Sequence, residues 1–161
     1  MSAIAIRPAT PEDVATILGF VRDLAAFERE PDAVKATDAM LTEALFGADP
    51  AAEAVIARDS TGPTGFALFF HNFSTWTGRR GLYLEDLYVA PHARGQGVGT
   101  ALLRHLASIA VERGCARFEW SVLDWNADAI AFYRSMGAVG QQDWTVQRVS
   151  GDALRRLAAL R

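Results

Sequence analysis

A glycine-rich stretch at residues 94–99, Arg-Gly-Gln-Gly-Val-Gly, stands directly before a helix-type pattern of apolar residues. Its glycines allow the backbone to approach a ligand closely and to point consecutive N–H groups at one place. A helix N-terminus adds partial positive charge there, and Arg94 adds a full charge. The stretch therefore predicts a diphosphate site, with a flexible turn before a helix as the alternative.

The spacing of these glycines excludes two common phosphate sites. A dinucleotide fingerprint requires Gly-x-Gly-x-x-Gly, but its last position is occupied by Thr100. A P-loop requires Gly-Lys followed by Ser or Thr, which this stretch lacks. The predicted diphosphate is therefore neither that of NAD nor that of ATP.

Acidic side chains are candidates for binding a cation. Glu85 and Asp86 are adjacent in an apolar strand pattern. On a regular strand they face opposite sides, one toward a ligand and one toward a structural partner. The indole of Trp76 offers a ring face to the same cation. Five carboxylates could together form an acidic groove for such a cation: Glu28, Glu85, Asp86, Glu119 and Asp143.

The elements that must position these residues follow from periodicity and turn residues. Strands are predicted at residues 4–8, 53–58, 64–73, 82–89, 116–123 and 144–149. Helices are predicted at residues 10–27, 37–47, 98–113 and 126–136, with a short helix at the C-terminal end. Thr10, Thr37 and Asn126 are the expected N-terminal caps.

This order of strands and helices predicts an α/β protein with a mixed sheet and helices on both faces. Residues 82–123 form a strand, a glycine loop, a helix and a second strand. The loop of such a unit lies at the carboxyl end of its first strand, where open α/β sheets bind ligands.

Composition narrows the class of protein. The chain has 161 residues, enough for one domain over residues 1–161, and a net charge of −3 that argues against nucleic acid as the main partner. The single cysteine, Cys115, excludes an internal disulfide. His71, His92 and His105 show no metal-binding spacing, so no metal is expected. No signal peptide or membrane-length apolar run is present, so we expect a cytoplasmic protein without membrane contact.

Two motifs carry a family resemblance. Residues 82–91 (LYLEDLYVAP), followed by the glycine stretch at 94–99, resemble the acetyl-CoA motif of the GNAT acetyltransferases. Trp-Asn at 125–126, followed by Ala129, Phe132, Tyr133 and Gly137, resembles their second cofactor segment.

A finer resemblance is to the spermidine/spermine (diamine) N-acetyltransferases and their bacterial relatives. It rests on Ile-Arg-Pro-Ala-Thr at 6–10, Trp-x-Gly at 76–78, Tyr-Leu-Glu-Asp at 83–86 and Trp-Asn at 125–126. It covers nearly the whole chain and weakens after Gly140.

The resemblance implies the GNAT fold, in which a central, mostly antiparallel sheet of six to seven strands is splayed at an acetyl-CoA cleft, with helices on both faces. It implies acetyl-CoA as cofactor, held by main chain along the strand that ends at Val89, by the glycine loop and by Asn126. For Asn126 a helix cap is the alternative role. The implied cofactor-binding residues are Leu87, Tyr88, Val89, Arg94, Gly95, Gln96, Gly97, Val98, Gly99, Thr100, Asn126 and Ala129.

The implied chemistry is direct transfer of an acetyl group to a primary amine in a ternary complex. An alkyl ammonium group with a pKa near ~10 must lose a proton before it can attack. By resemblance Glu85 is the base, acting directly or through water, and Tyr133 is the acid. A solvated strand charge is the alternative for Glu85, and a helix-core position is the alternative for Tyr133.

The implied acceptor site departs from the polyamine pattern. Phe27 replaces a tyrosine, the acidic residue expected shortly before Trp76 is Ser74 or Thr75, and the 140–144 segment is shorter. A shorter amine, or a lysine-like amino acid such as thialysine, is therefore as plausible as spermidine. The implied substrate-binding residues are Phe27, Glu28, Trp76, Glu85, Asp86, Glu119, Trp120, Ser121 and Asp143.

Two alternative functions stay open. The chain could acetylate protein N-termini or lysines, against which an acidic, Trp-bearing loop at 74–81 would count. It could also be a non-catalytic CoA sensor, against which intact Glu85 and Tyr133 speak. The family resemblance, and nothing else in the sequence, implies a homodimer.

Overall fold

The computed structural model describes residues 3–161, which divide into two compact units after Ser121. Residues up to Ser121 contain the whole sheet, and residues from Val122 onward contain two short helices. The prediction of one domain over residues 1–161 stays a prediction.

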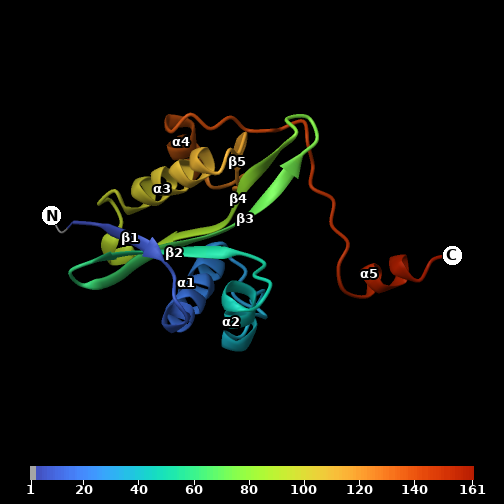
Figure 1. The fold of residues 1–161 in the computed structure, drawn as a ribbon, viewed down its shortest axis with the longest axis horizontal. Coiled ribbons are helices and arrows are strands. Elements are labelled where there is room, and N and C mark those ends of the chain that lie inside the picture. The colour runs from blue at the N-terminus through green and yellow to red at the C-terminus, as the bar shows by residue number, and fades with distance from the viewer. Residues whose placement is uncertain (1–2) are drawn as a thin grey trace. The chain divides into compact units, whose positions relative to one another are not determined.

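The first unit is built on a five-stranded sheet with the spatial order β1-β2-β3-β4-β5 (Figure 1). The first four strands are antiparallel to their neighbours, and β5 is parallel to β4. The strands are β1 (Ala5–Pro8), β2 (Glu53–Asp59), β3 (Gly62–Ser74), β4 (Arg79–Val89) and β5 (Arg117–Glu119).

Helices cover both faces of this sheet. In Figure 1, α1 (Val14–Phe27) and α2 (Asp38–Phe46) lie on one face, and α3 (Val98–Glu112) lies on the other. Short 3-10 turns, η1 (Pro11–Asp13) and η2 (Pro91–Ala93), precede α1 and α3. The second unit contains α4 (Ala127–Ser135) and α5 (Gly151–Ala158). The predicted mixed α/β class with helices on both faces is confirmed.

Of the predicted caps in the first unit, Thr37 accepts a cap hydrogen bond, whereas the Thr10 side chain accepts none and donates to Asp13. Thr37 Oγ1 accepts a hydrogen bond from the Met40 N–H at 3.2 Å and so begins α2. The Asp13 carboxylate accepts a hydrogen bond from the Thr10 N–H at 2.8 Å, and Arg7 holds the same carboxylate from β1 at 2.6 Å. The N-terminal strand and the first helix are therefore joined by one buried carboxylate.

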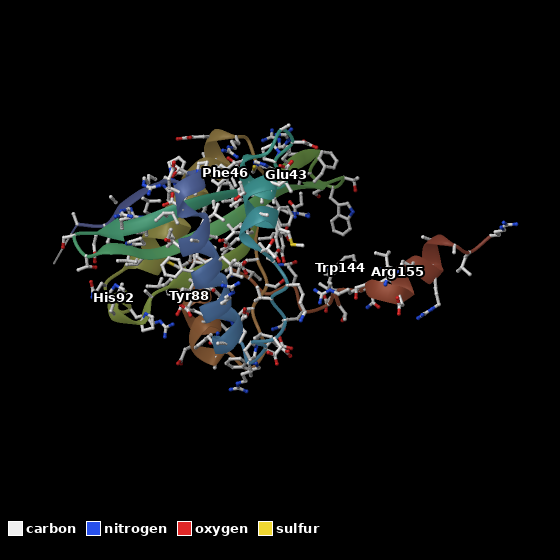
Figure 2. All side chains as sticks on the ribbon, turned by 90° about the horizontal axis from the view of Figure 1, so that it is seen from below. Glu43, Phe46, Tyr88, His92, Trp144 and Arg155 are labelled. Carbon is white, nitrogen blue, oxygen red and sulfur yellow. The ribbon has the colours of Figure 1, made fainter. Side chains whose placement is uncertain are left out.

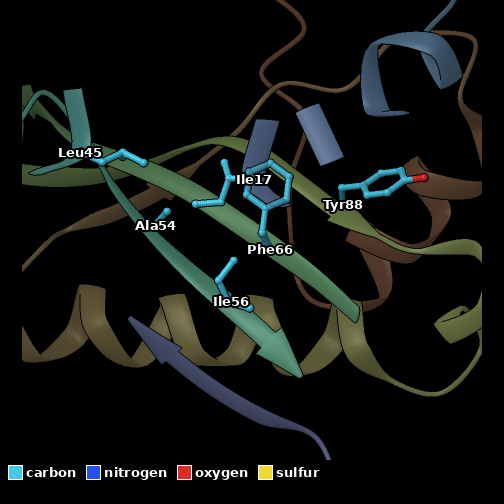
Figure 3. Close-up of a cluster of buried hydrophobic side chains, with 6 residues drawn as sticks. All are labelled: Ile17, Leu45, Ala54, Ile56, Phe66 and Tyr88. Carbon is cyan, nitrogen blue, oxygen red and sulfur yellow. The ribbon is translucent and has the colours of Figure 1, made fainter. Parts of the chain in front are cut away.

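A hydrophobic cluster fixes α1 and α2 on their face of the sheet. Figure 3 shows the six side chains, with Tyr88 at one end and its hydroxyl directed away from the others. Phe20 of α1 stacks on Phe66 and tilts against Tyr88, with ring centroids 5.8 and 5.6 Å apart. The end of β4 is therefore held firmly against α1. The buried members are Ile17, Leu45, Ala54, Ile56, Phe66 and Tyr88.

Three of the predicted strand details are wrong. The sheet has five strands among the described residues, not six to seven, because residues 144–149 pair with no strand. Alternating apolar residues there satisfy the strand pattern, but a strand forms only where its backbone finds a ladder partner. The strand predicted at 116–123 is limited to Arg117–Glu119, and the strand predicted at 82–89 begins at Arg79.

No helix in residues 3–161 is long and apolar enough to cross a membrane.

Candidate functional site

A β-bulge at Glu85 interrupts β4 in the middle of the predicted site. Leu68 of β3 pairs with Asp86, whereas the next β3 residue, Phe69, pairs with Leu84. Glu85 is thus the extra residue on β4. Bulges re-aim side chains, so the prediction that Glu85 and Asp86 alternate across a regular strand is wrong.

The pairing of aromatic rings shows how the bulge changes the two faces of β4. Tyr88 packs on the α1 face with Phe20, so Asp86 shares that face. In a regular strand, Tyr83 would lie on the face opposite to Tyr88. Instead, its ring centroid lies 5.2 Å from that of Phe70, which is on the α1 face together with Phe66. The bulge therefore brings Tyr83 and Asp86 onto one face.

Three carboxylates gather where α1 ends over this face. The Asp86 side chain is half-buried, and burial together with the charges of Glu85 and Glu28 raises its pKa to about 6. Burial also raises the pKa of Glu28, which follows the last residue of α1. Glu85 itself is exposed. Residues separated by more than fifty positions thus form one negatively charged site that would attract a cation.

The strand β5 covers only the beginning of β4. Their pairing runs from Gly81↔Arg117 to Tyr83↔Glu119 and then stops, so β4 from Leu84 onward has a free edge in the described sheet. The Ala90 N–H donates to the Thr64 carbonyl at 2.8 Å, so the backbone groups of Ala90 point toward β3. Along an antiparallel strand, the backbone groups of successive residues point alternately toward and away from the neighbouring strand. By that alternation the N–H and C=O groups of Leu87 and Val89 point away from β3, toward the free edge.

The glycine stretch follows this edge and begins α3. Gly95 and Gly97 have φ angles of +76° and +83°, which favour glycine, and a Cβ at either position would meet nothing within 4 Å. Gly97 is the N-cap and has no side chain to accept from the first-turn N–H groups. The loop is therefore an open cradle with free donors at a helix N-terminus, as a diphosphate site requires.

Arg94 does not extend freely from this loop. Its Nε donates a hydrogen bond to the Val89 carbonyl at 3.1 Å. Its guanidinium carbon lies 5.7 Å from the ring centroid of Phe27 and 5.6 Å from that of Tyr88. In the cradle itself, Gln96 Nε2 donates to the His92 carbonyl at 3.1 Å and tightens the loop.

The predicted acceptor residues near the end of β5 divide between the two faces. Tyr83 Oη and Ser121 Oγ are hydrogen-bonded at 2.9 Å, so Ser121 lies on the α1 face of the sheet, which also carries Asp86. Glu119 pairs with Tyr83 in a parallel register and shares that face. Trp120 packs on Phe118 with ring centroids 4.9 Å apart, on the opposite face.

Trp76 is not brought near these carboxylates within the first unit. It lies at the exposed tip of the β3–β4 hairpin, where its N–H donates to Ser74 Oγ at 3.2 Å. Arg79, the first residue of β4, lies six positions before Glu85. At ~3.3 Å per strand residue the tip lies roughly 20 Å from the bulge.

The remaining predicted residues belong to the second unit. Asn126 Oδ1 accepts from the Ala129 N–H at 3.3 Å, so the cap role weighed for Asn126 is confirmed. Tyr133 is half-buried on α4, with its ring centroid 5.6 Å from that of Phe132, and Asp143 is exposed after that helix. Their placement relative to Glu85 stays a prediction.

The sequence reasoning missed Tyr83 as a site residue and missed the bulge. The available signal was the adjacency of two acids in an apolar strand, since a bulge is one way to expose both.

The view in Figure 2 shows Tyr88 and His92 toward one end of the first unit, away from Glu43 and Phe46 on α2. Among residues 3–161 no group of three or more His, Cys, Asp or Glu side chains is placed to hold a metal ion.

Comparison with known proteins gives a consistent result. Residues 18–138 match the acetyltransferase (GNAT) family. The chain is 36% identical to thialysine N-epsilon-acetyltransferase from Sus scrofa over 169 residues, which covers 98% of this chain and 99% of the relative. It is 33% identical to spermidine/spermine N(1)-acetyltransferase-like protein 1 from Homo sapiens, covering 98% of this chain and 24% of that protein.

A solved structure has the same fold. An integron cassette protein from the mobile metagenome of V. cholerae is 27% identical, with a TM-score of 0.81 over 99% of both chains.

Proposed function

Since the chain belongs to the acetyltransferase (GNAT) family, we propose that this acetyltransferase acts on the primary amine of a small molecule. The substrate class is a lysine-like amino acid such as thialysine, or a diamine or polyamine. The relatives that carry those substrates in their names support this class over nearly the whole chain.

The carboxylate site is the observation that carries the proposal. Glu28, Glu85 and Asp86 place up to three negative charges where α1 meets the bulge of β4. An alkyl ammonium ion would offset their mutual repulsion and favour the ionised form of Asp86. An anionic or apolar acceptor would gain nothing from this arrangement.

The free edge of β4 and the glycine cradle fit acetyl-CoA, which enzymes of this family use. The outward N–H and C=O groups of Leu87 and the outward N–H of Val89 suit an amide-bearing arm, and the cradle at residues 95–100 suits a diphosphate. When bound, acetyl-CoA supplies the activated acetyl group. The chain supplies donors, shape and a place for the proton.

The proton of the ammonium group must pass to a carboxylate before the amine can attack. Glu85 is the base inferred from the family resemblance, and it is exposed at the bulge. Asp86 has a pKa of about 6, which suits a base at neutral pH because it is ionised there and still accepts protons readily. We assign the proton to this pair, with the neighbouring Glu28 holding the charged end of the substrate.

Tyr133, Asn126 and Ala129 are proposed to complete the cofactor site from α4. A phenol with a pKa of about 10 keeps its proton at neutral pH, so Tyr133 Oη is a suitable proton donor at the leaving sulfur. The cap bond from Asn126 to Ala129 fixes the start of the helix that carries Tyr133. We also propose that the protein is a cytoplasmic homodimer, as the family resemblance implies.

A substrate panel tests the proposed function. CoA release is measured with thialysine, lysine, ornithine, putrescine, spermidine and peptides with free N-termini or lysines. We expect the small amines to be acetylated and the peptides not. Activity confined to the peptides would overturn the proposal, as would acetyl-CoA binding without transfer to any of these compounds.

Two variants test the assignment of the base. Glu85→Gln and Asp86→Asn are each expected to lower kcat by about 10²-fold or more, because positioned base catalysis contributes about 10²–10⁴-fold. Calorimetric binding of acetyl-CoA should change less than threefold in both variants. If acetyl-CoA binding is lost in either variant, that residue maintains the structure of β4 and is not the catalytic base.

A further inference from the structure

Two hydroxyl groups meet where β4 and β5 separate. The pairing of these strands ends at Tyr83↔Glu119, and Ser121 follows Glu119 two positions later. Tyr83 Oη and Ser121 Oγ are hydrogen-bonded at 2.9 Å at the exposed surface of the α1 face. This hydroxyl pair, formed by Tyr83 and Ser121, is therefore accessible to a ligand that binds over that face.

The hydroxyl pair retains hydrogen-bonding capacity for such a ligand. A hydroxyl donates one hydrogen bond and accepts up to two. The bond between Tyr83 and Ser121 occupies one donor and one acceptor position, so further acceptor positions can receive N–H groups. Glu119 lies beside Tyr83 on the same face, and its carboxylate favours a cation over an anion there. The hydroxyl pair is therefore suited to an ammonium group.

The hydroxyl pair and the carboxylate site lie along one face of β4. Because Glu85 is the extra residue of the bulge, Tyr83 and Asp86 are successive residues on the α1 face. At ~3.3 Å per strand residue, their Cα atoms are roughly 7 Å apart. The Tyr83 ring packs 5.2 Å from that of Phe70, so an apolar surface accompanies this span. A short alkyl chain with an amino group at each end matches the span and its two polar ends.

We propose that Tyr83 is a specificity-determining residue, whose hydroxyl binds a second amino group of the acceptor together with Ser121. The carboxylate site of Glu28, Glu85 and Asp86 holds the amine that is acetylated. This inference rests on the proposed function and narrows its substrate class. The acceptor is a short diamine, or an amino acid that carries a second amino group on its side chain. A monoamine occupies only the carboxylate site.

Steady-state kinetics with putrescine and butylamine tests the proposal in the full-length chain. The two compounds differ only in the second amino group, which butylamine lacks. Tyr83→Phe removes one hydroxyl and is expected to raise KM for putrescine about tenfold, as the loss of a hydrogen bond to a charged group predicts. The kcat for putrescine and the KM for butylamine should each change less than twofold.

Ser121→Ala should act in the same direction as Tyr83→Phe. The effects of the two substitutions on KM for putrescine should not multiply in the double variant, because both remove parts of one hydrogen-bonded pair. Ser108→Ala is the matched control. Ser108 Oγ donates to the Arg104 carbonyl at 3.1 Å on α3, so its loss removes a hydroxyl without touching the α1 face. It should leave the KM for both amines unchanged.

Two kinetic results would overturn the inference. One is an equal rise in KM for putrescine and butylamine in Tyr83→Phe, which would mean that the hydroxyl maintains the structure of the site. The other is an unchanged KM for putrescine, which would mean that the hydroxyl does not contact the acceptor. The Kd for CoA should change less than threefold in every variant.

Calorimetry separates this inference from the proposed function. Putrescine and butylamine are each titrated into protein saturated with CoA, so no turnover is required. A wild-type chain that is inactive but binds putrescine more tightly than butylamine, with the difference lost in Tyr83→Phe, would remove only the proposed function. An active enzyme whose preference for putrescine survives in Tyr83→Phe would remove only this inference. Failure to bind either amine would remove both.

Discussion

At the scale of single residues, Asp86 and Glu85 are neighbours with different environments. Sequence reasoning identified both acids but assumed a regular strand, and it assigned the base to Glu85. The adjacency of the two acids is compatible with a bulge but does not fix it, because the bulge depends on pairing with β3 and the contact with Glu28 depends on the packing of α1. These contacts give Asp86 its raised pKa.

The first prediction concerns stability and the titration of Asp86. The folded-state pKa of about 6 lies above the unfolded value near 3.8, so the folded protein binds the proton more tightly. This contribution to stability is complete below about pH 4 and is lost as pH rises through 6. Asp86→Asn should therefore raise the free energy of unfolding at pH 7 by on the order of 1–2 kcal/mol.

Urea unfolding at pH 4 and pH 7 measures this effect. The gain from Asp86→Asn should be present at pH 7 and nearly absent at pH 4. In parallel, kcat/KM of the wild type should fall as pH drops through about 6, as Asp86 takes up its proton. A variant that is less stable at pH 7 would mean that the Asp86 carboxylate is paired rather than repelled.

The second prediction concerns Thr64. Its side chain is fully buried in β3, and its hydroxyl has no hydrogen-bond partner in the described residues. An unsatisfied buried hydroxyl costs free energy, and valine has nearly the same shape without it. Thr64→Val should raise the free energy of unfolding by about 1 kcal/mol.

Thr61→Val is the control for this prediction, because the Thr61 hydroxyl has a hydrogen-bond partner whereas the Thr64 hydroxyl has none in the described residues. Thr61 Oγ1 donates to Asp59 Oδ1 at 2.6 Å, so its loss should lower stability in the same urea titration. If Thr64→Val proves destabilising, the hydroxyl must instead bond to a buried water.

At the scale of elements, the prediction succeeded where a pattern is local. The helices α2, α3 and α4 lie within two residues of their predicted bounds, because periodicity, caps and terminal glycines are all encoded in one segment. The helix α1 ends at the predicted residue but begins four residues late, because the 3-10 turn η1 takes up its predicted first turn. The strands were less predictable. Residues 144–149 have the alternation of a strand, but no partner strand pairs with them in the described residues.

The third prediction compares two glycines at the start of α3. Gly97 has a φ of +83°, so Gly97→Ala is strained, and its methyl would enter the open cradle. We expect a loss of about 1–2 kcal/mol in stability and at least tenfold weaker CoA binding by calorimetry. The strain follows from the backbone alone, and the loss of affinity follows from blocked N–H donors.

Gly99→Ala is the matched control for this cradle. A Cβ at Gly99 would meet only Val89 Cγ2, at an ordinary 3.8 Å, and its φ is not in the left-handed region. It should preserve CoA binding and leave stability equal or slightly higher, because alanine favours helix. Equal CoA affinity in Gly97→Ala and the wild type would place the diphosphate elsewhere.

At the scale of the whole molecule, the two units differ in how they are stabilised. The first has a sheet and a buried core, whereas neither α4 nor α5 contains a buried residue. Isolated helices of eight or nine residues are marginal in water. The helices of the second unit therefore have little buried apolar surface of their own to stabilise them.

The last prediction tests the stability of these helices by hydrogen exchange and mass spectrometry, with and without CoA. Without CoA, amides of α4 should exchange much faster than those of α3, whose apolar face is buried. If Asn126, Ala129 and Tyr133 belong to the cofactor site, CoA should slow exchange across α4 as well as in the 95–100 cradle, because a ligand stabilises every segment that it requires to be folded. The helix α5, to which no cofactor role is assigned, should be unaffected and serves as the internal control. Protection of the cradle without protection of α4 would remove Tyr133 from the proton-donor role and leave the carboxylate pair on β4 to manage proton transfer alone.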